Sequence, residues 1–131
     1  MVKIVTEQSA QKYIELLVDG KIETEEMNEV FAQIEKRIAE WGDVLVLEEV
    51  RDIGQVEFGA FWKDLRFGLK NMGSFPRVAV VTDISWVQKI TKLADPMFTA
   101  DIRVFSLAEK EVAKNWLLQG NVQQEQHEAH P

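Results

Sequence analysis

The chain has 131 residues and a net charge of -7, with 22 acidic and 15 basic side chains. Its length suits one domain. The lack of cysteine excludes disulfides, zinc fingers and thiol nucleophiles, and it fits a reducing, cytoplasmic compartment. The negative charge argues against general nucleic-acid binding, and no apolar run is long enough for a signal segment or a membrane span.

The first forty residues predict a β-hairpin followed by a helix. Strands are expected at about 2–6 and 12–18, because the second run is rich in β-formers and turn residues ending at Gly20 follow it. Apolar residues then recur at helical spacing, with Thr24 suited to cap the helix and Gly42 to end it.

The rest of the folded part alternates between strand and helix patterns. A capping box of Ser106 and Glu109 predicts the start of the last helix, which should end at Gly120. Continuous apolar runs, typical of strands covered on both faces, predict strands at 44–47, 77–82 and 102–105, with 48–56 as a connection and further helices at about 58–72 and 84–93.

This order of elements predicts an α/β fold. Crossovers through helices give parallel strand pairs and the opening hairpin gives an antiparallel pair, so we expect a mixed five-stranded sheet with about four helices in a single domain over residues 1–120. Residues 121–131 are polar and are expected to form a disordered tail.

The opening hairpin, Gly20, the capping residue Thr24 and the apolar third strand together resemble the SpoIIAA-like family of the STAS superfamily. The resemblance implies a STAS-like fold, which also looks like the CRAL-TRIO lipid-carrier domains. Anti-sigma-factor antagonists of that superfamily carry a phosphorylatable serine between the third strand and the second helix. Residues 50–58 contain no serine or threonine, so the usual kinase-driven switch would lack its acceptor here.

The helix expected at 58–72 is rich in aromatic residues on one face, with basic residues beside it. SpoIIAA-like proteins are thought to bind small apolar ligands and to associate reversibly with membranes through movable helices, and aromatic walls suit such a ligand. We therefore predict a non-enzymatic module with a small apolar or lipid-like ligand, and peripheral contact with the inner face of the membrane. The residues predicted to line the site are Phe58, Phe61, Trp62, Leu65, Leu69, Trp86 and Ile90, with Lys63, Arg66 and Lys70 at its rim.

Other interpretations of the same stripe remain open at this point. It could pack on the sheet as ordinary core, bind a regulatory protein in the manner of STAS domains, or pair with a second copy in a homodimer.

Catalysis is the least supported class. Four carboxylates, Glu48, Glu49, Asp52 and Asp83, follow buried strands and could hold a metal or exchange protons, although solvated loops explain them as well. His127 and His130 belong to the predicted tail. No nucleophile elbow or nucleotide-binding loop is present, so we predict no catalytic residue, no metal site and no cofactor.

Overall fold

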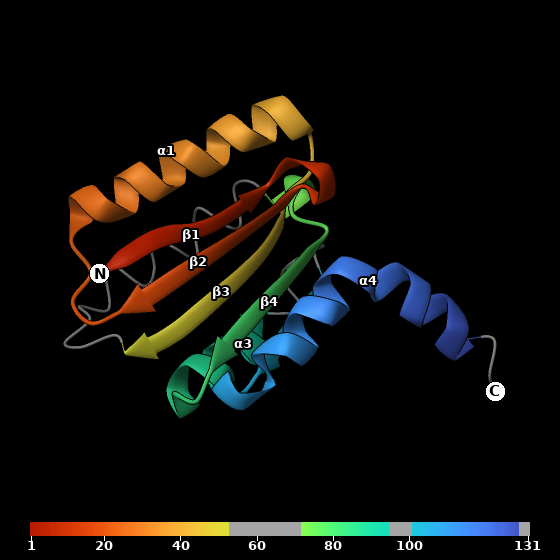
Figure 1. The fold of residues 1–131 in the computed structure, drawn as a ribbon. Coiled ribbons are helices and arrows are strands. Elements are labelled where there is room, and N and C mark those ends of the chain that lie inside the picture. Colours follow the sequence, from red (N-terminus) through yellow and green to blue (C-terminus); the bar gives the residue numbers. More distant parts are fainter. Residues whose placement is uncertain (53–71, 95–100, 129–131) are drawn as a thin grey trace.

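Five strands form one sheet in the order β1-β2-β3-β4-β5 (Figure 1). The computed structural model describes residues 1–52, 72–94 and 101–128, with side chains described for all of these except 72, 90–94 and 120–128. β1 and β2 are antiparallel, and β3, β4 and β5 each continue the sheet in parallel, as the sequence predicts. The strands are β1 (Val2–Gln8), β2 (Tyr13–Asp19), β3 (Leu45–Asp52), β4 (Arg77–Thr82) and β5 (Asp101–Phe105).

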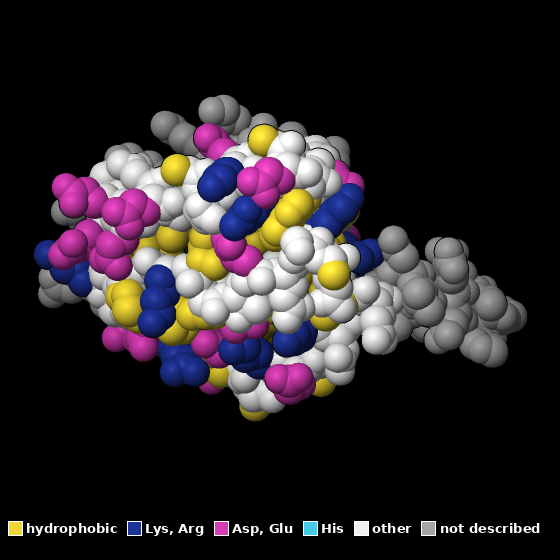
Figure 2. All heavy atoms as spheres, turned by 45° about the horizontal axis from the view of Figure 1, so that its top comes forward, with side chains coloured by type: hydrophobic (Ala, Val, Ile, Leu, Met, Phe, Trp, Pro, Cys, Tyr) yellow, Lys and Arg dark blue, Asp and Glu magenta, His cyan; other side chains and the backbone are white. Residues whose placement is uncertain are grey.

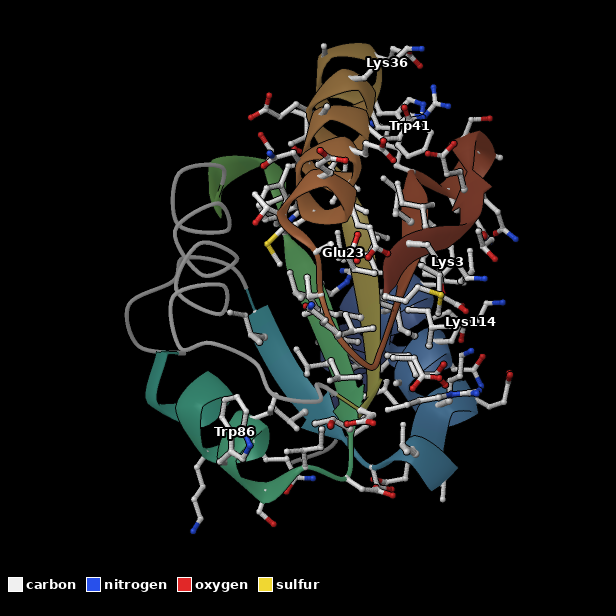
Figure 3. All side chains as sticks on the ribbon, turned by 90° about the vertical axis from the view of Figure 1, so that its left-hand side faces the viewer. Lys3, Glu23, Lys36, Trp41, Trp86 and Lys114 are labelled. Atoms are coloured by element: carbon white, nitrogen blue, oxygen red, sulfur yellow. The ribbon has the colours of Figure 1, made fainter. Side chains whose placement is uncertain are left out.

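Helices cover both faces of this sheet. The described α-helices are α1 (Thr24–Trp41), α3 (Ser85–Ala94) and α4 (Lys110–Glu128). The short 3-10 turns η1 (Ser9–Gln11), η2 (Met72–Ser74) and η4 (Leu107–Glu109) precede β2, β4 and α4. α1 and α3 share one hydrophobic cluster, whereas α4 packs in a second cluster on the opposite face. Figure 3 shows the two sides, with Trp86 of α3 to the left of the sheet and Lys114 of α4 to the right.

Alternating side chains along β2, β3, β4 and β5 supply both clusters. Ile14 and Val46 belong to the α1 and α3 cluster, while their neighbours Tyr13 and Leu47 belong to the α4 cluster. Successive residues of a strand point to opposite faces, so a strand that is covered on both sides must be apolar at consecutive positions. This requirement explains the continuous apolar runs in the sequence.

Three predicted boundaries are wrong. Thr24 is the first residue of α1, and Glu23 takes the N-cap position without a side-chain capping bond. β3 runs to Asp52 rather than ending at Leu47, because its buried residues continue through Val50. α4 passes through Gly120 to Glu128, since one glycine inside a helix costs only about 1 kcal/mol relative to alanine.

Of the remaining expectations, the helix end at Gly42 is confirmed and the others are not tested. Gly42 ends α1 as predicted, with a left-handed φ of 83° that favours glycine. The domain boundary at residue 120 and the polar tail stay predictions, although 121–128 continue α4. The helix predicted at 58–72 lies almost wholly outside the described residues; only 72 is described, in η2.

Candidate functional site

Most of the predicted ligand-binding residues lie outside the part of the chain that the structure describes. Ile90 belongs to α3, but its side chain is not described. Trp86 is the one predicted site residue whose side chain can be placed. The residues outside the described ranges are Phe58, Phe61, Trp62, Lys63, Leu65, Arg66, Leu69 and Lys70.

Trp86 lies in the first turn of α3, close to the edge where the parallel strands end. The turn is fixed by Thr82, whose hydroxyl accepts a hydrogen bond from Ile84 N–H at 3.1 Å and whose carbonyl accepts one from Gln88 Nε2 at 2.8 Å. Val87 is 3% exposed and anchors the helix in the core, whereas Trp86 is 41% exposed. The helix therefore holds a large apolar side chain at the surface on a fixed base (Figure 3).

The four carboxylates that the sequence places after buried strands, Glu48, Glu49, Asp52 and Asp83, are positioned differently from one another. Glu48 and Glu49 lie within β3 rather than in a loop after it, because the strand is longer than expected. Asp83 does follow β4, and its Oδ1 accepts a hydrogen bond from Leu107 N–H at 2.9 Å, at the start of η4. Among the side chains that the structure describes, no group of three acidic or histidine residues could hold a metal ion.

A second polar feature, which sequence reasoning missed, lies beneath the start of α4. Glu15 and Glu49 are 8% and 6% exposed, on neighbouring strands of the sheet. Lys110 Nζ lies 3.0 Å from Glu15 Oε2 and 3.6 Å from Glu49 Oε1. Tyr13 donates a hydrogen bond of 2.7 Å to Glu15, and Arg51 Nε lies 3.2 Å from Glu49. We call these five residues the Lys110 cluster.

The charges of the Lys110 cluster stabilise one another. Burial tends to raise the pKa of Glu15, but the hydrogen bonds from Tyr13 and Lys110 outweigh it and hold that pKa below its usual range. Burial likewise tends to lower the pKa of Lys110, and the two glutamates outweigh it and raise that pKa. Burial and the neighbouring Glu15 also raise the pKa of the Tyr13 hydroxyl.

This arrangement suits structure better than acid–base catalysis. A general acid or base works best with a pKa near the working pH, and the shifts in Glu15, Lys110 and Tyr13 all move away from neutrality. One feature of the sequence points to the cluster. Tyr13 and Glu15 are two residues apart in β2, so they share one face of a strand whose other residues are mostly apolar and buried.

Comparisons with known proteins agree with the fold. A family model described as SpoIIAA-like matches residues 13–118. The chain belongs to the SpoIIAA-like family. Its structure is similar to that of an uncharacterized DUF3478-family protein with a SpoIIAA-like fold from Shewanella loihica PV-4. The TM-score is 0.72 and the sequence identity 24%, covering 88% of this chain and 93% of that one. No curated protein matches the chain.

The SpoIIAA-like fold suggests a non-enzymatic regulatory module. None of the helices in the described ranges is both long and apolar enough to cross a membrane.

Proposed function

We propose that this SpoIIAA-like protein is a binding module that holds a small apolar or lipid-like ligand on the α3 side of the sheet and performs no catalytic step. The observation that carries the proposal is the contrast within α3 between Trp86, 41% exposed, and Val87, buried in the core. Exposing a tryptophan costs hydrophobic stabilisation, and its amphipathic ring suits a boundary between an apolar and an aqueous environment.

The sequence supplies further apolar surface for such a ligand. Phe58, Phe61 and Trp62 precede α3 in the chain, and Lys89 is an exposed cation three residues after Trp86. An anionic headgroup beside an apolar tail would match this combination. Reversible contact with the inner face of the membrane, and the likeness to CRAL-TRIO domains, stay predictions within this proposal.

Native mass spectrometry of the purified protein, followed by mass spectrometry of its organic-solvent extract, tests the proposal. We expect a co-purified apolar molecule at close to one per chain. Titration with oleate then measures the site, and Trp86→Ala should weaken oleate binding about tenfold, as expected for losing one large buried aromatic contact.

Val112→Ala is the matched control, because Val112 is 56% exposed on α4, on the other face of the sheet. This variant should bind oleate like the wild type. A clean apo mass together with no oleate binding and no flotation with anionic or neutral vesicles would refute the ligand proposal.

A STAS-type regulator that binds another protein is the second candidate, and membership in the SpoIIAA-like family favours it. Residues 50–58 lack a serine or threonine acceptor, so such binding would not be switched by phosphorylation there. In a pull-down, Trp86→Ala would then lose a stoichiometric protein partner while lipid extracts stay blank.

A further inference from the structure

The two edges of the sheet differ in what their outward backbone groups contact. At the β1 edge, Glu26 of α1 accepts a hydrogen bond from Val2 N–H at 3.2 Å. Figure 2 shows acidic side chains gathered at the left-hand end of the molecule, where α1 begins in Figure 1. A carboxylate of α1 thus takes a position on β1 that an added strand would need.

β5, the strand at the other edge, directs the backbone groups of Ile102 and Val104 away from the sheet. Asp101 N–H donates to the Pro76 carbonyl at 3.1 Å, and Asp101 pairs with Arg77 in the parallel ladder with β4. In such a ladder, residues bonded to the neighbouring strand alternate with residues whose N–H and C=O point the other way. Within the described part of the chain, no hydrogen bond is made to these outward groups of Ile102 and Val104.

The side chains of β5 carry a charge pattern that is its own complement. Asp101 and Arg103 are two residues apart, so they lie on one face of the strand, with side chains 37% and 47% exposed. Ile102 lies between them on the other face and packs against the α1 and α3 cluster. Turning this triplet about a two-fold axis through Ile102 places each aspartate opposite an arginine.

The surrounding contacts leave this match intact. Arg77 lies beside Asp101 on β4, but its Nε donates to the Leu117 carbonyl. The Arg103 guanidinium lies 4.8 Å from the centre of the Trp116 ring, and its contact with Asp101 is long, at 3.6 Å. The edge therefore carries one charge of each sign. An edge with charges of a single sign would repel a second copy, whereas this balanced pair attracts one.

We propose that the β5 edges of two copies of this chain pair in antiparallel fashion about a two-fold axis through Ile102, joining the two sheets into one. The Ile102 residues of the two copies exchange two main-chain hydrogen bonds, and Asp101 pairs with Arg103 on each side of the axis. A two-fold interface uses the same patch on both copies, so it requires a self-complementary surface. Moving the axis to Arg103 would place two arginines opposite each other, which is unfavourable, so the charges also select the register.

Sedimentation of the purified full chain at low salt tests whether the dimer forms. The edge is short, so we expect a weak dimer with a dissociation constant between about 1 μM and 1 mM. The average mass should rise with protein concentration and fall as salt is added, because the charge pairs are exposed. The proposed ligand plays no part in this pairing, so ligand-free protein is used. A chain that stays monomeric at about 1 mM would overturn the proposal.

Charge reversals distinguish this pairing from any other dimer. Asp101→Arg gives an edge with two cations and Arg103→Asp an edge with two anions, so each variant alone should dimerise at least about tenfold more weakly. An equal mixture of the two should recover the dimer, because every cation then lies opposite an anion. The double variant Asp101→Arg/Arg103→Asp should dimerise within about threefold of the wild type, since the exchange keeps the match.

Asp43→Arg is the matched control, because Asp43 is an exposed aspartate outside β5. This variant should dimerise within about twofold of the wild type. Melting temperatures check that each variant folds. A dimer that neither reversal weakens, or a mixture that stays monomeric, would overturn the proposal.

The main-chain bonds have a test of their own. Ile102→Pro removes the outward N–H, and an edge strand tolerates proline where the N–H faces away from the sheet, so this variant should fold and stay monomeric. A measurement on the wild type needs no variant: exchange of the Ile102 amide hydrogen should slow as protein concentration rises. A dimer in which this amide exchanges at the monomer's rate would place the interface elsewhere and overturn the proposal.

Discussion

The two faces of the sheet are stabilised in different ways. The α1 and α3 face is a broad apolar cluster, and its ion pair between Arg37 and Glu7, at 2.8 Å, lies at the rim. The α4 face combines a smaller apolar cluster with the Lys110 cluster, whose two glutamates are buried in the sheet. Because the charge pairs of Lys110 with Glu15 and Glu49 add to the apolar packing of α4, we expect α4 to be the more rigidly placed helix.

Contacts at Lys110 and at Leu117 hold the first half of α4 on the sheet. Lys110 binds the sheet at its first residue, and seven residues on, the Leu117 carbonyl accepts a hydrogen bond of 2.9 Å from Arg77 Nε. Between them Trp116 contacts the Phe105 ring, with centroids 5.9 Å apart, and lies beneath the Arg103 guanidinium. A helix held this way cannot move to fill a cavity beneath it.

The largest effect should come from opening such a cavity. Leu117→Ala should lower the free energy of unfolding by about 3–4 kcal/mol, and Ile34→Ala on α1 by about 2–3 kcal/mol, because α1 can move toward the sheet and α4 cannot. Both residues are nearly fully buried, at 0% and 3% exposure. Urea denaturation measures both values, and an equal or reversed order would contradict the difference between the faces.

Removing the Lys110 ammonium, which contacts both Glu15 and Glu49, should have the next largest effect on the free energy of unfolding. Lys110→Met leaves Glu15 and Glu49 buried without it, and we expect a loss of about 2–3 kcal/mol in unfolding free energy. This is below the roughly 3–5 kcal/mol of fully buried pairs, because Tyr13 and Arg51 still contact the two glutamates.

Lys36→Met is the control, since Lys36 is an exposed lysine on α1 (Figure 3). It should change the unfolding free energy by no more than about 0.5 kcal/mol. If both lysine variants had the same small effect, the Lys110 cluster would contribute nothing to stability.

Acid should weaken the α4 face through Glu15. Its pKa is lowered in the folded state, so its stabilising contribution is present above the unfolded pKa of about 4.3 and is lost as pH falls through the folded value. The unfolding free energy of Glu15→Gln should therefore fall less between pH 6 and pH 3 than that of the wild type. Parallel pH curves would show that Glu15 titrates alike in both states.

The smallest effect concerns the capping box that precedes α4. Ser106 N–H donates to Glu109 Oε1 at 2.9 Å, and the bonds between these two residues lower the pKa of Glu109. Ser106→Ala should cost about 0.5–1 kcal/mol in unfolding free energy. Ser85→Ala, at an exposed position that begins α3, offers a comparison outside a capping box, and an equal loss there would argue against a specific role for Ser106.

Local patterns were enough to predict the sheet but not the Lys110 cluster. The apolar runs at 44–47 and 77–82 and the stop at Gly42 each depend on neighbouring residues alone. The structure confirms a strand at each run and the stop, although β3 extends beyond its run to Asp52. The cluster joins Glu15 and Lys110, which lie 95 positions apart, from 15 to 110, and only the packing of α4 on the face of the sheet brings them together.

The role of Trp86 in ligand binding, predicted from its place in an amphipathic helix, stays a prediction. The structure adds that its side chain is exposed at the surface, which the sequence pattern alone does not show.

The order of strands in the sheet is also their order in the chain, β1 to β5. Each new strand can therefore join the edge left by the previous one, without threading between strands already in place. Contacts between sequence neighbours lower the entropy lost in closing loops and favour rapid folding. As the chain emerges from the ribosome, β1, β2, α1 and β3 could assemble before β4 and β5 are synthesised, leaving α4 to close the second face last.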